Sequence, residues 1–203
     1  MVRCRRGFTL VEMLVSMAIF AIVTGFTVAN FRRGGQGDEL RLAAENLASS
    51  IRRAQTFAIA GESQFICSST KLICDPAVGA SCVAGTCSRT VPNGYGIRLS
   101  TAAGEERKAV LFADTGMTGN RRYDAGEMIS SRGISPTPLV KISFLAPSSG
   151  TDLDIVFVPP KPRIYFNDNA TTDAVAVITL QQIGTGLTKL VKVNRVSGQV
   201  GVE

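Results

Sequence analysis

The sequence predicts an α+β protein, in which one long N-terminal helix packs on a domain of antiparallel β-strands. Three observations predict it: an apolar run that begins at Phe8, a following stretch with apolar residues at helical spacing, and strand-like patterns after Gly61. Hydrophobic residues make up 45% and charged residues 19% of the 203 residues, which is typical of a folded chain. We therefore expect a basic leader (1–7), an apolar helical segment (8–31), an amphipathic continuation of the helix (32–61) and a β-rich domain (62–203).

The apolar segment is long enough to cross a membrane. From Phe8 to Phe31 the only ionisable side chain is Glu12. As a helix these residues span roughly 36 Å, more than the hydrocarbon core of about 30 Å. The arginines of the leader favour a cytoplasmic N-terminus. A signal peptide cleaved near Thr27-Val28-Ala29, a plain membrane anchor and a buried core helix are the alternatives.

The second helical stretch carries an apolar stripe that predicts packing against a sheet. We expect Gly34, Gly35 and Gly37 to form a hinge before it, since glycine weakens a helix. Asp38 is the expected N-cap and Gly61 the expected stop. The stripe consists of Leu40, Ala44, Leu47, Ile51, Ala54 and Ala58.

After Gly61 the pattern becomes that of β-strands separated by glycine and proline. Ser197-Gly198 is expected to turn between the last two strands. The predicted strands are Ser63–Cys67, Lys71–Cys74, Tyr95–Ser100, Lys108–Ala113, Val140–Leu145, Asp154–Val158, Ala174–Leu180, Leu187–Val193 and Gln199–Val202.

The peptide GFTLVEMLVSMAIFAI, after a short basic leader, resembles the type IV prepilin signal. The resemblance implies that a prepilin peptidase cuts between Gly7 and Phe8 and then N-methylates Phe8. It also implies that Glu12, the fifth mature residue, guides assembly. A carboxylate at the end of an apolar helix is costly unless it has a partner. The buried terminal amine of another subunit would be that partner.

The remaining chain resembles the GspH/FimT group of minor pilins and pseudopilins. The resemblance lies in LASSIRRAQTFAI, VLFADTGMTGNRRYDAGEMI and the segment from DIVFVPP to KLVKVNRVSGQV. It implies a pilin-like fold and a non-catalytic subunit that initiates or tips a type II secretion pseudopilus or a type IV pilus. The implied partners are other pilin subunits, the prepilin peptidase and the inner-membrane assembly platform. The implied location is a single inner-membrane span with a periplasmic C-terminal domain, and then the filament. A pilus-tip module for DNA uptake or surface adhesion is the alternative.

Four cysteines remain once the leader, with Cys4, is removed: Cys67, Cys74, Cys82 and Cys87. In an extracytoplasmic domain this even number predicts two disulfides. Three pairings are open, and we favour Cys67–Cys74 with Cys82–Cys87. A Cys₄ zinc site and free thiols are the alternatives, and no Cys-x₂-Cys pair supports zinc.

The absence of histidine excludes a Ser-His-Asp triad, a Cys-His pair and a His-bound zinc site. We therefore expect no enzyme, no cofactor and no metal. The stretch DTGMTGNRRYDAGE (114–127) is read as a turn-rich loop rather than a calcium loop, because Gly116 and Thr118 stand where oxygen ligands would be needed. DNA-binding relatives carry a Gly-Arg-x-Arg motif, but Gly198-Gln199-Val200-Gly201 lacks both arginines. DNA uptake is therefore not expected, although Lys189, Lys192 and Arg195 leave weak binding open.

Overall fold

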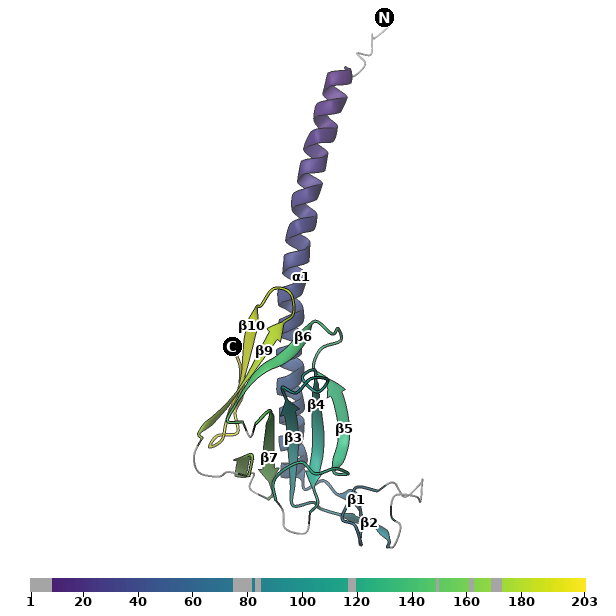
Figure 1. The fold of residues 1–203 in the computed structure, drawn as a ribbon, viewed down its shortest axis with the longest axis vertical. Coiled ribbons are helices and arrows are strands. Elements are labelled where there is room, and N and C mark those ends of the chain that lie inside the picture. The colour runs from purple at the N-terminus through teal and green to yellow at the C-terminus, as the bar shows by residue number, and fades with distance from the viewer. Residues whose placement is uncertain are drawn as a thin grey trace, which may run out of the picture. The chain divides into compact units, whose positions relative to one another are not determined.

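The computed structural model describes residues 9–74, 82, 85–116, 120–148, 150–160, 163–168 and 173–203, with the backbone alone for 28–36. The chain divides into two compact units, residues 1–38 and residues 39–203. Its elements are one helix and eleven strands, so that the predicted α+β class is confirmed for the described residues. Figure 1 shows the strands of the second unit gathered along the final part of the helix.

Helix α1 spans Leu10–Ala60 and continues through Gly34, Gly35 and Gly37. The predicted interruption at these glycines is therefore not seen, and Asp38 lies inside the helix rather than at its N-cap. Gly61 ends the helix as predicted, with a positive φ of 59°. The N–H of Gly61 donates to the carbonyl of Ala58 and that of Glu62 to the carbonyl of Phe57, at 3.3 and 3.1 Å, which is a Schellman motif.

The strands form three antiparallel sheets. The order is β1-β2 in the first sheet, β11-β10-β9-β6 in the second and β5-β4-β3-β7-β8 in the third. The strands are β1 (Gln64–Cys67), β2 (Cys87–Thr90), β3 (Gly94–Ser100), β4 (Lys108–Asp114), β5 (Met128–Gly133), β6 (Val140–Ala146), β7 (Asp152–Val158), β8 (Arg163–Phe166), β9 (Val175–Gln182), β10 (Thr188–Asn194) and β11 (Val200–Val202).

The core of the second unit lies between the helix and the two larger sheets. All six residues of the predicted stripe are buried, together with Ala43 and Ala48. Small alanines on this face leave room for large side chains from the strands, such as Phe157 and Phe166. Tyr95 ties the helix end to the sheet, because its hydroxyl donates to the carbonyl of Glu62 at 2.5 Å. Burial raises the pKa of Tyr95 to about 12.

The strand predictions failed mainly at short, exposed strands. β2, β5 and β8 were not predicted, and each lies at the end of its sheet. β2 and β5 are mostly exposed, so that their sequences lack the alternation that marks a half-buried strand. The predicted strand Lys71–Cys74 is reduced to a single bridge between Ile66 and Ile73. The turn at Ser197-Gly198 is confirmed, with Gly198 at a φ of 71° between β10 and β11.

Candidate functional site

The N-terminal segment is the first candidate site. The predicted cleavage pair, Gly7 and Phe8, lies outside the described residues. The stretch Leu10–Thr27 of α1 has a mean hydropathy of 2.0 and is long and apolar enough to cross a membrane. Its large side chains are solvent-exposed in the isolated chain; Phe20, for example, is 75% exposed. Such a surface needs lipid or other apolar helices around it.

Glu12 takes part in a local contact that the sequence also signals. The Oγ1 of Thr9 accepts a hydrogen bond from the N–H of Glu12 at 3.3 Å. In return the Oε2 of Glu12 accepts from the N–H and the hydroxyl of Thr9, at 3.4 and 3.3 Å. This reciprocal pattern is a capping box, and the spacing Thr9-x-x-Glu12 is its sequence signature. The N-cap predicted at Asp38 therefore lies at Thr9.

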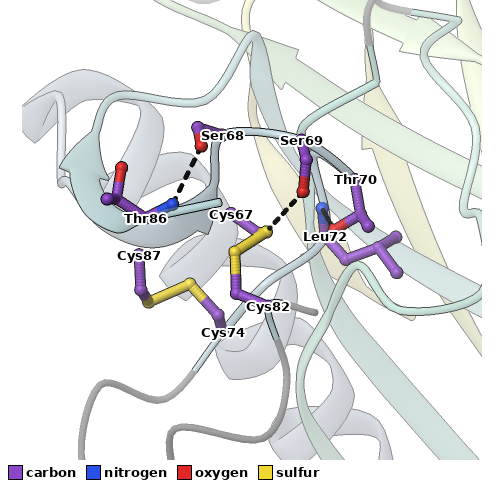
Figure 2. Close-up of a disulfide and its surroundings, with 9 residues drawn as sticks. All are labelled: Cys67, Ser68, Ser69, Thr70, Leu72, Cys74, Cys82, Thr86 and Cys87. Carbon is purple, nitrogen blue, oxygen red and sulfur yellow. Dashed lines mark hydrogen bonds between the residues drawn. A yellow bond between two sulfur atoms is a disulfide. The ribbon is translucent and has the colours of Figure 1, made fainter. Parts of the chain in front are cut away.

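Two disulfides fasten the small β1-β2 sheet and the chain around it. The Cα atoms of Cys67 and Cys82 are 5.5 Å apart, and those of Cys74 and Cys87 are 6.1 Å apart. Figure 2 shows both bridges together, with the N–H of Thr86 donating to the hydroxyl of Ser68 at 3.0 Å. Two bridges were predicted and the structure contains two.

The favoured pairing, Cys67–Cys74 with Cys82–Cys87, is wrong. The reason is the register of the chain that returns beside β1. The N–H of Cys67 donates to the carbonyl of Leu72, and that of Cys74 donates to the carbonyl of Phe65, both at 2.9 Å. Leu72 rather than Cys74 therefore lies opposite Cys67. Cys67 is bonded to Cys82 instead, and Cys74 is bonded to Cys87.

Two buried carboxylates hold the two ends of the loop that joins β4 to β5. Asp114 ends β4 and its Oδ2 accepts from the N–H of Arg121 at 3.2 Å. The Oε1 of Glu127 accepts from the N–H groups of Thr115 and Gly116, at 2.9 and 3.1 Å. Its Oε2 accepts from the N–H of Asp124 at 3.0 Å. Asp114 and Glu127 are 0% and 1% exposed, so that they act as internal acceptors for the loop backbone.

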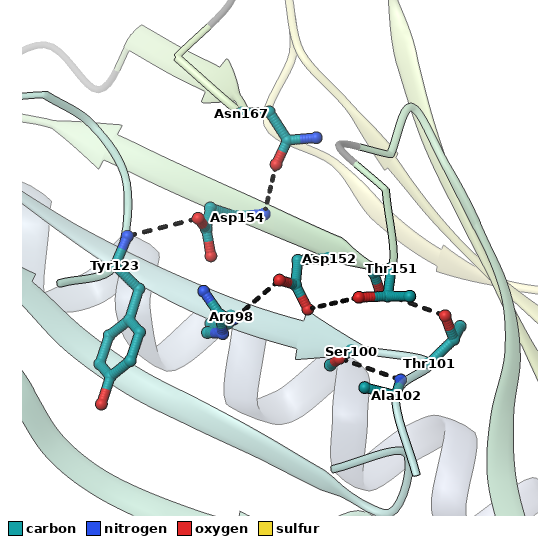
Figure 3. Close-up of polar contacts among 9 residues, drawn as sticks. All are labelled: Arg98, Ser100, Thr101, Ala102, Tyr123, Thr151, Asp152, Asp154 and Asn167. Carbon is teal, nitrogen blue, oxygen red and sulfur yellow. Dashed lines mark hydrogen bonds and ion pairs between the residues drawn. The ribbon is translucent and has the colours of Figure 1, made fainter. Parts of the chain in front are cut away.

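A third buried carboxylate reaches the same loop from a different strand. Asp154 lies on β7, and its Oδ2 accepts from the N–H of Tyr123 at 3.3 Å (Figure 3). Arg98, on β3, donates to Asp152 at 2.8 Å, and its guanidinium lies 5.2 Å from the centre of the Tyr123 ring. Asp154 is only 4% exposed, so that it is buried against a loop about thirty residues earlier in the chain, a contact that the sequence alone does not show.

Burial raises the pKa of two of these three carboxyl groups. It raises the pKa of Asp114 to about 6, with a further contribution from the negative charges of Glu127 and Asp124. It also raises the pKa of Asp154 to about 6. Among the described residues, Oδ1 of each aspartate is buried without a hydrogen-bond partner. The same part of the chain contains no cluster of three His, Cys, Asp or Glu side chains placed to hold a metal.

Comparison with known proteins identifies the N-terminal segment. Residues 2–28 match the family model described as the prokaryotic N-terminal methylation motif. The match supports a type IV pilin-like protein. Such a motif implies assembly with other pilins and processing by a prepilin peptidase, and with the apolar helix it fits anchoring in the inner membrane. No curated protein and no solved structure matches the chain.

Proposed function

We propose that this pilin-like chain is a minor pilin or pseudopilin of the GspH/FimT type, a non-catalytic subunit that helps to initiate or tip a filament. The filament is a type II secretion pseudopilus or a type IV pilus. The observation that carries the proposal is the methylation motif over residues 2–28, at the start of a 51-residue helix with an apolar first third. A second unit with its own core, residues 39–203, supports a globular domain carried by that helix.

The proposed processing site is the bond between Gly7 and Phe8. Cleavage removes Arg3, Arg5 and Arg6 and exposes the amine of Phe8, which is then methylated. The new N-terminus precedes the capping residue Thr9 by one position, so that the helix start and the charged amine come close together. Mass spectrometry of the N-terminal peptide tests this step. Methylated Phe8 supports it, whereas a mature chain that starts after Ala29 would indicate an ordinary signal peptide.

The proposed assembly residue is Glu12. Its capping contacts with Thr9 are 3.3–3.4 Å long, near the upper limit for hydrogen bonds. They involve neutral donors, which leave the negative charge uncompensated in an apolar surrounding. The methylated amine of a neighbouring subunit supplies the opposite charge. A buried carboxylate that lacks its partner costs about 3–5 kcal/mol, enough to select the correct axial position of the subunit.

The test separates charge pairing from helix capping. Glu12→Gln keeps an oxygen that can accept from Thr9 but removes the charge, Glu12→Ala removes both, and Thr9→Ala weakens the cap while keeping the charge. We expect all three chains to be processed and inserted. Both Glu12 variants should lose co-purification with partner pilins by at least about tenfold, which corresponds to 1.4 kcal/mol. Assembly of Glu12→Gln at the wild-type level would show that capping, not charge, is the role of Glu12.

The alternative function, DNA uptake, receives little support from the C-terminal turn. Lys192 is paired with Glu203 at 2.5 Å, and the guanidinium of Arg52 donates to the carbonyl of Val200 at 2.9 Å. Lys192 and Arg52 therefore already contact acceptors within the domain. A salt-dependent DNA shift assay on the detergent-solubilised chain decides between the two functions, because phosphate binding weakens steeply as salt rises.

A further inference from the structure

Strand β5 forms one open edge of the five-stranded sheet. The strand order is β5-β4-β3-β7-β8, so that β4 is the only strand beside β5 among the described residues. Figure 1 shows β5 on the outer side of β4. Every residue of Met128–Gly133 is exposed or half-buried. Such an edge can pair with the backbone of another chain.

The backbone of β5 carries hydrogen-bonding groups that point away from β4. The N–H of Ile134 donates to the carbonyl of Arg107 at 3.0 Å, and the same register places Ser131 opposite Val110. In an antiparallel pair the residues point their N–H and carbonyl groups alternately towards and away from the partner strand. Counting back from Ile134, Gly133 and Ser131 therefore point theirs outwards. These are the groups to which a further strand would bond.

A crevice of about 60 Å³ lies beside this edge, between the helix and the sheet. It is lined by Ser49, Ser50 and Arg53 of α1, by Ser130 and Arg132 of β5, and by the core residues Ile97, Ala109 and Leu111. All eight residues belong to the unit 39–203. The volume is far below the roughly 300 Å³ of the smallest ligand pockets, so that it suits the end of one side chain.

Two arginines make the crevice positive. Arg53 and Arg132 are exposed, and neither forms an ion pair with a residue that the structure describes. The guanidinium of Arg53 lies 5.2 Å from the centre of the Phe57 ring, a contact that holds it beside the helix. Serine hydroxyls from both walls add further donors. A carboxylate is the group that such a set of donors binds best.

The acidic residues of the neighbouring segments have other partners. Glu127, next to β5, is buried and accepts from N–H groups of its own loop. The others bond as follows: Glu39 accepts from Ser135 at 3.2 Å, Glu45 pairs with Arg41 at 3.1 Å, Glu105 with Lys108 at 2.7 Å, and Glu106 with Arg107 at 3.8 Å. None of these five acids lines the crevice. The carboxylate for Arg53 and Arg132 would therefore come from another molecule.

We propose that β5 is the docking edge for an extended acidic segment of a partner protein. The segment adds a strand to the sheet through the outward groups of Ser131 and Gly133, which is recognition by β-strand addition. Alternate side chains of an added strand lie on the same face of the sheet, so that a glutamate on that face reaches Arg132 and the crevice. The inference depends on residues 39–203 alone and not on the filament to which the chain belongs.

A second copy of this chain is a poorer occupant of the edge. Two β5 strands paired antiparallel around Ser131 would place both Arg132 side chains on one face of the sheet. Like charges across neighbouring strands are destabilising. An acidic partner replaces this repulsion by attraction.

The test measures the binding of two labelled peptides to the full chain in a non-ionic detergent, by fluorescence anisotropy. The first peptide is Thr-Glu-Val-Glu-Val-Thr, and the second has glutamine in place of both glutamates. Arg132→Gln removes the charge at the crevice. The matched control, Arg163→Gln, removes the same charge from an exposed position on β8, at the opposite edge of the same sheet. Ser131→Pro removes one outward N–H, which β4 does not use, so that the edge strand tolerates the proline.

We expect the glutamate peptide to bind at least about tenfold more tightly than the glutamine peptide. Arg132→Gln should abolish this difference, whereas Arg163→Gln should change the affinity by less than about twofold. Ser131→Pro should weaken the binding of both peptides, and circular dichroism checks that the variant keeps its sheet. If that variant does not fold, Arg132→Gln and its control decide.

Three results would overturn the inference. The first is that the glutamate peptide does not bind at about 1 mM, or binds equally well to Arg132→Gln. The second is a dimer that grows with protein concentration and is lost in Ser131→Pro, which would assign the edge to a second copy. The third is a single-stranded oligonucleotide that binds, is weakened by Arg132→Gln and is unaffected by Ser131→Pro. The crevice would then be assigned to phosphates rather than to a protein strand.

Discussion

Replacing Asp114 by asparagine removes a carboxylate that the fold buries completely. Asparagine keeps an oxygen that can accept from the N–H of Arg121, as Oδ2 of Asp114 does at 3.2 Å. Its amide group takes the place of Oδ1, which has no partner among the described residues. Glu127, an acceptor on the same loop, then faces a neutral side chain instead of a second negative charge. The variant therefore measures the free-energy cost of burying the charge while the hydrogen bond from the N–H of Arg121 is kept.

The expected gain follows from the pKa of Asp114, which burial raises from 3.8 to about 6. Below pH 4 the carboxyl is protonated in both the folded and the unfolded chain. Between pH 4 and 6 only the unfolded chain ionises, so that the free energy of unfolding falls as the pH rises. The full shift corresponds to about 3 kcal/mol. Since proteins respond to a buried charge with an effective dielectric constant of about 20, which lowers the cost of the charge, we expect roughly 1–2 kcal/mol.

Urea unfolding of the detergent-solubilised full chain at pH 4 and pH 7, followed by the β-sheet signal, measures this effect. Asp114→Asn should be more stable than the wild type at pH 7 by the stated amount and should show little gain at pH 4. Asp168→Asn, at a half-exposed aspartate that pairs with Arg121 at 3.2 Å, is the matched control and should show no gain at pH 7. A variant of Asp114 that is destabilised at pH 7 but not at pH 4 would refute the reasoning, because the ionised carboxylate would then stabilise the fold.

Two further predictions concern packing and covalent structure. Gly96→Ala should lower the free energy of unfolding by about 1–3 kcal/mol, because its methyl group would lie 2.5 Å from Cζ of Phe112. The control is Gly37→Ala, whose methyl group would meet nothing within 4 Å in the helix. It should be neutral or stabilising in the same unfolding assay. Mass mapping without reduction should recover a peptide that joins Cys74 to Cys87, and replacing both by serine should cost about 3 kcal/mol. Recovery of Cys74 joined to any other cysteine would contradict the structure.

The buried face and the end of the helix could be predicted from the sequence because both depend on local backbone geometry. The stripe from Leu40 to Ala58 follows the helical repeat, and every predicted member is buried. Gly61 was readable as a stop, since glycine readily adopts the positive φ found there. The hinge and the N-cap at Asp38 were misjudged because residues around them are only mildly unfavourable in a helix. The continuous hydrogen-bonding of the helix outweighs propensities of that size.

The N-terminal motif could be recognised from the sequence alone, because three arginines, Gly7-Phe8, Glu12 and an apolar run all lie within about thirty residues. The match to the methylation motif covers residues 2–28 of the same region. Tertiary structure decided which cysteines bond, since the register beside β1 places Leu72 and not Cys74 opposite Cys67. It also brought Asp154 of β7 to the loop that follows Asp114. The physical reason is the same in both cases. A pairing between distant residues depends on how strands align, and strand alignment is set by the packing of the whole core.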